Sequence, residues 1–399
     1  MRIETHFTGE SDTAMTEKLY YQNSHLFEFD AVVLDCREEK KGYSVVLDRT
    51  AFFPEGGGQL ADTGTLGAAR VIDVHERGGE IRHYTDAPLA VGERVEGCLD
   101  AEQRRRRMQN HSGEHILSGL VHNAFGYDNV GFHMGSDCMT IDFSGELTWE
   151  QLTELETQAN AVVRENLPLR IWYPDPDELK ALDYRSKLEL TENVRIVEIP
   201  GVDRCACCAP HVERTGEVGV IKILDAQRHR GGVRVSVVCG LDALDDYRAR
   251  QESVTEISRA LSAKRGEVAE AVRRVLREQQ IMKEKSDALA LALIRYMAEA
   301  EAATDGNLLV FSDVLGEIAQ RELVNLLVPK AGGFAAVFCG GDETGWRYVI
   351  GSRHVNLRAA SRTINAAIDG RGGGASEMIQ GSARAKRAEI ENALKELNL

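Results

Sequence analysis

The chain has 399 residues, of which 43% are hydrophobic and 28% are charged. At about 150 residues per domain, this length predicts two or three domains and excludes a small protein that depends on disulfides. The composition is that of a globular protein, which excludes bulk disorder. The formal net charge of −15 excludes a general attraction to nucleic acid, so we expect any contact with RNA only at local patches.

The sequence also lacks membrane and export signals. No stretch approaches the roughly 18 uncharged apolar residues that a membrane-spanning helix needs. The N-terminal segment MRIETHFTGESD contains acidic residues early and has no apolar signal core. We therefore expect a cytoplasmic protein without a membrane partner, in which disulfides among the eight cysteines are disfavoured.

Residues 1–95 are predicted to form a β-rich domain. Short runs rich in valine and phenylalanine, LFEFDAVVLDC and YSVVLD, favour strands separated by a polar turn. RVIDVHE and EIRHYTD indicate a hairpin that turns at residues 77–79. FFPEGGGQLADTG contains a proline and three consecutive glycines, which predicts a loop or tight turn.

Residues 96–240 are predicted to form an α+β domain. The segment 101–125 has apolar residues at helical spacing, and LTWEQLTELETQANAVVRENL indicates an amphipathic helix. Short strands are expected at MTIDFSG, RIWYPD, VRIVEI, GVIKILD and VRVSVVCG.

Residues 241–303 have almost no turn signals, which predicts a linker of two long helices. A heptad pattern runs from Val268 to Tyr296 and is weakened at Gln279 and Ser286. Two interpretations remain open. The helices form a strut or an oligomer contact, or they pack against their own domain.

Residues 304–399 combine strands such as GNLLVFSDV, FAAVFCG and RYVIGS with helical patterns, which predicts a small α/β domain. The expected fold class is therefore α+β with several domains: a β-rich N-terminal domain, an α+β domain, a long helical linker and a small α/β C-terminal domain. A homodimer through the linker or the C-terminal domain is one expected partner.

Two motifs predict a metal site. His111 and His115 in HSGEH lie four apart on the predicted helix 101–125, so their imidazoles share one face. Cys207 and His211 in CACCAPH are also four apart, in a predicted loop between strands. Because thiolate and imidazole together suit zinc, we expect zinc as the cofactor.

The ligand set and the role of the zinc stay open at this point. Cys205 and Cys208 form a C-x2-C pair, and either could replace Cys207 or bind a second metal. Four protein ligands are typical of structural zinc, whereas catalytic zinc keeps a position for water. HSGEH also matches the inverted peptidase pattern H-x-x-E-H, in which Glu114 is the general base. That alternative needs a further ligand on a following helix and leaves the cysteine motif unexplained. An exposed helical position is the simpler interpretation of Glu114.

These motifs resemble the editing domain of alanyl-tRNA synthetase and its free-standing AlaX relatives. H-x3-H is followed by C-x3-H and VERTGEVG, and DRTAFFPEGGGQLADTG resembles the glycine-rich signature of the family. GRGGGASEMIQGS is similar to the glycine motif of the DHH-associated C-terminal domain. The order of these signatures is closest to the long AlaX type. One departure is CCAPH, which stands where the family usually has C-G-G-T-H.

The resemblance implies a zinc-binding editing domain at 96–240 and a DHH-associated domain at 304–399. About 25 residues precede the β-rich region, which is too few for an aminoacylation domain. The implied activity is therefore editing in trans, the deacylation of a tRNA for alanine that carries serine or glycine. Two alternatives come from other classes: the zinc peptidase, and a tRNA-binding module that binds RNA without turnover.

The resemblance also implies site residues. Zinc would be held by His111, His115, Cys207 and His211. Thr50 and Gln59 would hydrogen-bond the seryl hydroxyl, because an alanyl group would leave buried polar atoms unpaired. Glu114 is a further catalytic candidate, as a base.

Three glycines and two arginines are the other residues that we expect to contact the substrate. Gly56, Gly57 and Gly58 would let the backbone approach the substrate closely, although a structural turn is equally compatible. Arg104 and Arg105 belong to the run of four arginines before the metal-site helix and would contact the tRNA acceptor backbone. A solvated helix face is the simpler interpretation of this run.

Overall fold

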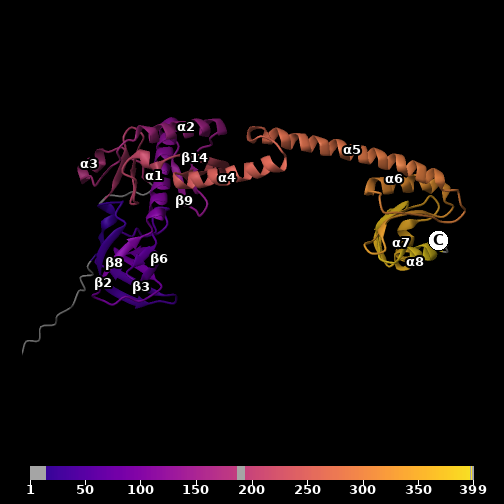
Figure 1. Ribbon diagram of the computed structural model, residues 1–399, viewed down its shortest axis with the longest axis horizontal. Helices are drawn as coiled ribbons and strands as arrows, with labels where there is room; N and C mark the ends of the chain where they lie inside the picture. The colour runs from indigo at the N-terminus through magenta and orange to yellow at the C-terminus, as the bar shows by residue number, and fades with distance from the viewer. Residues whose placement is uncertain (1–14, 187–193, 396, 398–399) are drawn as a thin grey trace, which may run out of the picture. The chain divides into compact units, whose positions relative to one another are not determined.

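The computed structural model describes residues 15–186, 194–395 and 397 (Figure 1). The chain divides into two compact units, an N-terminal unit of residues 1–253 and a C-terminal unit of residues 254–399. The finer domain boundaries expected from the sequence stay predictions.

The N-terminal unit begins with a closed six-stranded β-barrel, in the order β2-β3-β7-β6-β5-β8 (Figure 1, indigo). Its neighbouring strands are antiparallel, and closure pairs the edges that an open sheet would leave free. Large apolar side chains such as Leu47, Leu66 and Ile81 fill its core. The β-rich prediction for this region is confirmed. The strands are β2 (Glu28–Glu38), β3 (Tyr43–Leu47), β5 (Gly64–Leu66), β6 (Ala69–Arg77), β7 (Glu80–Thr85) and β8 (Arg94–Leu99).

A short parallel pair flanks the barrel and leads into the glycine-rich loop. It consists of β1 (Glu17–Lys18) and β4 (Arg49–Thr50), and the 3-10 turn η1 (Leu19–Tyr21) follows β1.

Helix α1 (Ala101–Phe125) follows the barrel almost directly. The side chain of Asp100 caps its first turn by accepting a hydrogen bond from the Gln103 N–H at 3.0 Å. Its last turn ends at Gly126, whose φ of 69° lies in the left-handed region that glycine adopts easily. The helix predicted for 101–125 is therefore confirmed to the residue.

Helix α1 and helix α2 (Trp149–Glu165) pack on one four-stranded antiparallel sheet, in the order β14-β15-β10-β9. Apolar side chains from both helices and the sheet share one core, in which Ile116, Leu155 and Val235 are buried. The edge strand β9 was not expected from the sequence. The strands are β9 (Asn129–Met134), β10 (Met139–Phe143), β14 (Ile221–His229) and β15 (Gly232–Cys239).

A second, three-stranded sheet leads into the cysteine motif. Its order is β11-β12-β13, and all its pairings are antiparallel. The remaining elements of this part are β11 (Arg170–Trp172), α3 (Pro176–Ala181), β12 (Ile196–Ile199), β13 (Asp203–Ala206), η2 (Thr215–Val218) and α4 (Leu241–Ala260).

The C-terminal unit contains the long helix α5 (Val268–Ala300) and a five-stranded sheet in the order β16-β17-β18-β20-β19. β16 and β17 are parallel, and the other pairs are antiparallel. Apolar side chains of α5 and α6 form one core with the sheet, and those of α7 and α8 form another. Its other elements are η3 (Arg265–Glu267), β16 (Leu308–Ser312), α6 (Glu317–Leu327), η4 (Val328–Lys330), β17 (Ala335–Gly341), β18 (Gly345–Gly351), α7 (Leu357–Ala367), β19 (Gly370–Gly374), β20 (Met378–Ala383) and α8 (Arg387–Lys395).

The glycine cluster GRGGG forms the edge strand β19, a strand that the sequence pattern did not predict. A Cβ added at Gly372 would lie 2.3 Å from the Gln380 carbonyl oxygen and from the Tyr348 hydroxyl. Glycine at this position therefore serves close packing in the sheet. Within the described ranges, no helix is both long enough and apolar enough to span a membrane.

The arginine run at the start of α1 corrects the expectation that Arg104 contacts tRNA. Arg104 is fully buried and forms an ion pair with Asp62 of the glycine-rich segment. It also donates hydrogen bonds to the carbonyls of Ser24, at 3.0 Å, and Ala51, at 2.5 Å. A guanidinium enclosed in this way cannot reach a phosphate at the surface.

Arg107 contacts the same buried carboxylate, with its Nη1 3.4 Å from Asp62 Oδ1. The Phe53 N–H donates to Asp62 Oδ2 at 2.7 Å. Asp62 therefore ties the glycine-rich segment to the first turns of α1. The interpretation of the run as a solvated face is wrong for Arg104 and Arg107, because burial of a charge requires a partner that the linear pattern does not reveal.

Replacing Arg104 with methionine should destabilise the N-terminal unit by about 3–5 kcal/mol, because Asp62 would stay buried with a weaker partner. Arg105→Met is the matched control. Arg105 is exposed and stacks on the Phe27 ring, so its loss should change the free energy of unfolding by less than about 1 kcal/mol. Urea denaturation followed by circular dichroism compares the two variants, and equal destabilisation would contradict the buried ion pair.

Candidate metal centre

Helix α1 presents His111 and His115 on one face, one turn apart. Their ring centroids lie 5.5 Å from each other, and both side chains are buried. The prediction that the two imidazoles of the HSGEH motif share one face of the helix is therefore confirmed.

The loop after β13 brings Cys207 and His211 to the same place. Arg195 holds this loop, since its Nη1 donates to the carbonyls of Cys207, at 2.9 Å, and Ala209, at 3.0 Å. The Arg195 carbonyl in turn accepts from the Cys207 N–H at 3.0 Å. This loop lacks the two glycines that are usual in the AlaX family. Three hydrogen bonds to Arg195 hold it in place instead.

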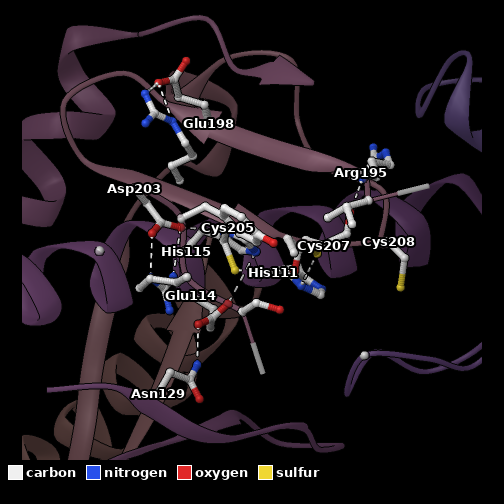
Figure 2. A pocket seen from close by; sticks show the side chains of 18 of the residues that line it. His111, Glu114, His115, Asn129, Arg195, Glu198, Asp203, Cys205, Cys207 and Cys208 are labelled. Atoms are coloured by element: carbon white, nitrogen blue, oxygen red, sulfur yellow. Dashed lines mark hydrogen bonds and ion pairs between the residues drawn. The ribbon is translucent and has the colours of Figure 1, made fainter. Parts of the chain in front are cut away.

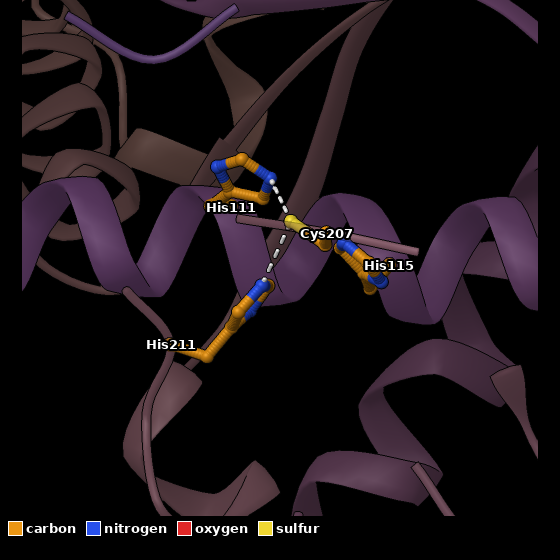
Figure 3. Close-up of side chains that lie close together, drawn as sticks. All are labelled: His111, His115, Cys207 and His211. Carbon is orange, nitrogen blue, oxygen red and sulfur yellow. Dashed lines mark hydrogen bonds between the residues drawn. The ribbon is translucent and has the colours of Figure 1, made fainter. Parts of the chain in front are cut away.

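Four potential metal ligands converge in this arrangement (Figure 3). One ligand atom from each of His111, His115, Cys207 and His211 lies within 4.8 Å of all the others. Cys207 Sγ is 3.5 Å from His111 Nε2 and 3.3 Å from His211 Nε2. The two distant halves of the predicted motif therefore form one cluster.

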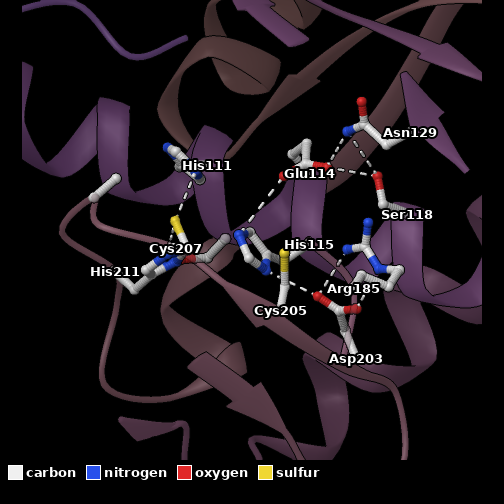
Figure 4. Close-up of polar contacts among 12 residues, drawn as sticks. His111, Glu114, His115, Ser118, Asn129, Arg185, Asp203, Cys205, Cys207 and His211 are labelled. Atoms are coloured by element: carbon white, nitrogen blue, oxygen red, sulfur yellow. Dashed lines mark hydrogen bonds and ion pairs between the residues drawn. The ribbon is translucent and has the colours of Figure 1, made fainter. Parts of the chain in front are cut away.

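The outer nitrogen of each imidazole has its own hydrogen-bond partner. His111 Nδ1 lies 2.9 Å from Gln59 Oε1, and this oxygen accepts. His115 Nδ1 lies 2.8 Å from Asp203 Oδ2, which also accepts (Figure 4). His211 Nδ1 lies 3.1 Å from the Ser112 hydroxyl. When such a ring is neutral and carries its proton on Nδ1, the lone pair of its Nε2 is free to bind a metal in the cluster. Such outer hydrogen bonds are the usual way in which proteins orient metal-binding histidines.

The electrostatics favour a thiolate at Cys207. Burial raises the pKa of this thiol, but electrostatic interactions and hydrogen bonds with the surrounding imidazoles, that of His111 first, outweigh that effect and hold the pKa well below its ordinary value. Burial lowers the pKa of His211 to about 3, so its imidazole is neutral at physiological pH. A thiolate among imidazoles is a donor set that suits zinc.

The other two cysteines differ from Cys207. Burial raises the pKa of the Cys205 thiol to about 11, and Cys205 groups with His115 and Asp203 instead of the full cluster. Cys208 is exposed and belongs to neither of these groups. Of the alternatives that the sequence left open, the geometry favours Cys207 as the ligand.

Glu114 is buried, which corrects the simpler expectation of an exposed helical glutamate. Its Oε1 accepts hydrogen bonds from Ser118 Oγ and Asn129 Nδ2, both at 2.5 Å. Its Oε2 lies 3.8 Å from His115 Nε2, on the side of the cluster. Burial raises the pKa of Glu114, but electrostatic interactions with His115 and with the Arg185 guanidinium outweigh that effect, so the pKa is lowered. Glu114 is therefore ionised, and its Oε2 accepts neither of these two hydrogen bonds.

Asp203 and Arg185 were missed by the sequence analysis. Asp203 accepts from Arg185 Nε at 2.7 Å and from Arg185 Nη2 at 2.9 Å, while it also holds His115. The sequence spacing of Asp203, Arg185 and His115 follows no motif. They meet because strand β13 carries Asp203 and pairs with the chain at Arg185. Asn129, Ser112 and Arg195 were also missed, because the partners of each come from other parts of the fold, as with Asn129 and Glu114 or Ser112 and His211.

The glycine-rich turn lies against α1 and β9. Gly57 and Gly58 have φ values of 61° and 83°, in the left-handed region that glycine adopts easily. A Cβ on Gly58 would lie 2.6 Å from the Phe132 carbonyl oxygen, so the turn is also closely packed. Gly57 lines the cavity beside the cluster, whereas Gly56 has an ordinary backbone conformation. The turn places the side chain of Gln59 within hydrogen-bond distance of His111.

Thr50 of β4 is fully buried beside His83 of the barrel strand β7 and is not among the residues that line the cavity. His83 Nδ1 lies 3.1 Å from the Val45 carbonyl, which can only accept, so His83 Nε2 accepts in turn from the Thr50 hydroxyl at 2.8 Å. The Phe52 N–H donates to Thr50 Oγ1 at 3.1 Å. The hydroxyl proton of Thr50 is therefore already used, and a further partner would have to donate to its oxygen.

A cavity of about 1510 Å³ opens beside the cluster (Figure 2). It is lined by His111, Glu114, His115 and Cys207 together with aromatic rings. The rings belong to Tyr21, Phe132, Tyr173 and Tyr184. This volume exceeds the typical range for small-molecule sites, so a ligand larger than an amino acid fits.

Arg105 does not line this cavity. It is exposed, with its guanidinium carbon 4.7 Å from the centre of the Phe27 ring. Its expected contact with tRNA stays a prediction.

The peptidase alternative finds no support in the cluster. That alternative requires a third ligand from a following helix, typically a glutamate. In the described part of the chain, the group around His111 and His115 is instead completed by Cys207 and His211 from a loop.

Comparisons with known proteins agree with the sequence resemblance. The family described as threonyl and alanyl tRNA synthetase second additional domain matches residues 194–236, which include Cys207 and His211. The family described as tRNA synthetases class II (A) matches residues 3–103.

Similar proteins cover most of the chain. The alanyl-tRNA editing protein AlaX-L of Pyrococcus horikoshii is 29% identical and covers 94% of this chain, which spans 96% of that protein. The alanine–tRNA ligase of Halorubrum lacusprofundi is 36% identical over 67% of this chain, and that of Halobacterium salinarum is 34% identical over 86%. The chain spans only 30% and 39% of the lengths of these two ligases.

Replacing Asp203 with alanine should weaken metal binding by about 10–100-fold, because His115 would lose the partner that fixes its ring. Competition between the purified protein and a chromophoric chelator for zinc measures this affinity. Asp137→Ala, which removes an exposed aspartate, is the control and should leave the affinity unchanged. Equal affinity of both variants would contradict the proposed orientation of His115.

Proposed function

We propose that this chain, which is AlaX-L-like and related to alanyl-tRNA synthetase, deacylates a tRNA for alanine that carries serine or glycine. The bond broken is the ester between the amino acid and the terminal ribose. The observation that carries the proposal is the convergence of three imidazoles and the Cys207 thiol in one cluster, of which His111, His115 and Cys207 line a large cavity. The editing protein similar over 94% of the chain supports the substrate class.

A zinc ion is the cofactor that this donor set fits. The residues that would hold it are His111, His115, Cys207 and His211. The Nδ1 atom of each of the three histidines already has another hydrogen-bond partner, which leaves Nε2 for the metal. Bound zinc supplies Lewis acidity, which polarises a carbonyl or lowers the pKa of water.

Glu114 is the group of this chain that would take the proton from the attacking water. Its Oε1 already accepts two hydrogen bonds, which hold the carboxylate in place, and its Oε2 faces the cluster. The lowered pKa keeps it ionised, so it can act as a base at neutral pH.

Gln59 would have two functions. Its Oε1 accepts from His111 Nδ1 and so positions that ring. Its Nε2 is buried and has no hydrogen-bond partner among the described residues. A buried donor without a partner costs free energy, and a substrate oxygen would supply the partner.

Aromatic side chains support an RNA end as the ligand of the cavity. The ring of Tyr173 is exposed and lies 6.4 Å from the ring of Tyr21, while Phe132 lies 5.0 Å from the ring of His111. Unpaired bases bind proteins largely by stacking on such rings. The terminal nucleotide of a tRNA would therefore enter this cavity with its aminoacyl group toward the cluster.

The decisive experiment measures hydrolysis of matched seryl- and alanyl-tRNA for alanine. The zinc-loaded wild type should deacylate the seryl ester faster than the alanyl ester, and His111→Ala should lose activity together with a ligand. Glu114→Gln should retain zinc and lower the rate by about 10²–10⁴-fold, because only the base is removed.

An intact seryl ester after prolonged incubation with zinc-loaded protein would contradict the proposal. Salt-sensitive tRNA binding without any turnover would instead support the binding module. Peptide cleavage that Glu114→Gln abolishes, without ester hydrolysis, would support the peptidase.

Thr50 is proposed to distinguish the seryl from the alanyl group by accepting a hydrogen bond from the seryl hydroxyl. Thr50→Val should therefore reduce the ratio of seryl to alanyl deacylation rates by about 5–100-fold, the equivalent of one hydrogen bond of about 1–3 kcal/mol. Thr50→Ser keeps the hydroxyl and serves as the control. An unchanged ratio in Thr50→Val, measured with folded protein, would reject this role.

A further inference from the structure

One cationic side chain in the wall of the cavity has no carboxylate partner. Four lysine and arginine side chains of the described ranges line this cavity, and Arg195 is the one that forms no ion pair with a described residue. The other three pairs are Lys18 with Glu76 at 2.7 Å, Arg185 with Asp203 at 2.7 Å and Arg204 with Glu198 at 2.5 Å. The positive charge of Arg195 is therefore available to a ligand of the cavity.

Arg195 is also buried, with an exposed fraction of only 6%. Its contacts are two backbone carbonyls and the face of the Tyr21 ring, whose centre lies 5.1 Å from the guanidinium carbon. These groups stabilise a cation in part, but none of them carries a negative charge. Because a buried charge without an opposite charge is costly, the site favours a ligand that is an anion.

The guanidinium of Arg195 has one edge in use and one edge free. Its Nη1 donates both hydrogen bonds to the cysteine loop, on the carbonyls of Cys207 and Ala209 (Figure 2). Its Nε is buried without a hydrogen-bond partner, and Nη2 takes part in none of the hydrogen bonds of the described residues. The Nε and Nη2 donors point in the same direction and match two oxygens of one phosphate or carboxylate group.

Aromatic rings beside Arg195 favour a nucleotide as the source of this anion. The Tyr21 ring that Arg195 contacts lies 6.4 Å from the ring of Tyr173, which is exposed, and both tyrosines line the cavity. Unpaired bases bind by stacking on such rings. A base on the rings would bring its own phosphate near the guanidinium, whereas a lone carboxylate would leave the rings unused.

We propose that Arg195 binds the phosphodiester group that precedes the terminal nucleoside of the tRNA, through its Nε and Nη2 atoms. This proposal rests on the proposed function, which brings the end of a tRNA into the cavity. The terminal ribose carries this phosphate on one side and the aminoacyl ester on the other. A phosphate held by Arg195 would therefore limit where the ester can lie relative to the cluster.

Arg195 would in this way connect the substrate to the candidate metal centre. Its Nη1 already holds the backbone of Cys207, one of the four potential metal ligands. If Nε and Nη2 hold the phosphate, a single planar group fixes the ligand loop and the substrate relative to each other. A role in the loop alone would use only Nη1 and would leave the charge and the other donors without a function.

The test compares the binding of two short RNAs to the zinc-loaded, full-length protein. The first is the trinucleotide CCA, the unpaired end of a tRNA, and the second is the same trinucleotide with an uncharged methylphosphonate in its last linkage. By isothermal titration calorimetry, the wild type should bind the first RNA about 10–100-fold more tightly, because the second lacks the charge that Arg195 pairs with. Arg195→Met should reduce this ratio to about one.

Arg204→Met is the matched control. Arg204 also lines the cavity, but it is paired with Glu198, so its loss should leave the ratio between the two RNAs at the wild-type value. Zinc content and circular dichroism show whether each variant keeps the cysteine loop and the fold. Arg195→Lys is a second variant for the case in which Arg195→Met loses zinc. Its ammonium can still donate to the loop carbonyls but has no pair of parallel donors, so the ratio should fall at least about threefold.

Equal binding of the two RNAs by the wild type would overturn the proposal. It would also be overturned by a wild-type ratio in Arg195→Lys and in folded Arg195→Met, or by an equal loss of the ratio in Arg204→Met. Since neither RNA carries an amino acid, these results do not depend on ester hydrolysis. A wild type that hydrolyses the seryl ester but binds both RNAs equally would contradict only the phosphate site, and the reverse result would contradict only the deacylase activity.

Discussion

A stripe of buried polar side chains along helix α1 is the constraint on which the N-terminal unit depends. Arg104, Arg107, His111 and His115 follow one another at spacings of three or four residues and therefore share one side of the helix. Each must find a partner in the interior, because burial of an unpaired polar group or charge is costly. Those requirements fix how the barrel, the glycine-rich turn and the cysteine loop approach α1.

The ion pair with Asp62 connects this stripe to the candidate metal centre. Asp62 holds Arg104 and Arg107 of α1, and the same segment of chain carries Gln59 to the ring of His111. Asp203 acts in the same way from the opposite side, through His115. The orientation of the metal-facing nitrogens thus comes from residues that never touch the metal, which is a general property of histidine sites.

The C-terminal unit presents the opposite situation. Its sheet and helices bury apolar side chains in two cores of their own, but α5 leaves a row of apolar side chains exposed. Where α1 has polar groups that the fold must pair internally, α5 has apolar groups that only another surface can cover.

The sequence by itself determined the features that depend on neighbours along the chain. The 3.6-residue period sets the bounds of α1 and the shared face of His111 and His115, and the glycine and proline signals mark the turns of the barrel. Only the tertiary structure decided that Arg104 is internal, that Glu114 is buried, and that Cys207 rather than Cys205 or Cys208 joins the histidines. These outcomes depend on pairings between residues tens to about a hundred positions apart. Burial and the choice of partner are set by the packing of whole elements, which a local pattern does not contain.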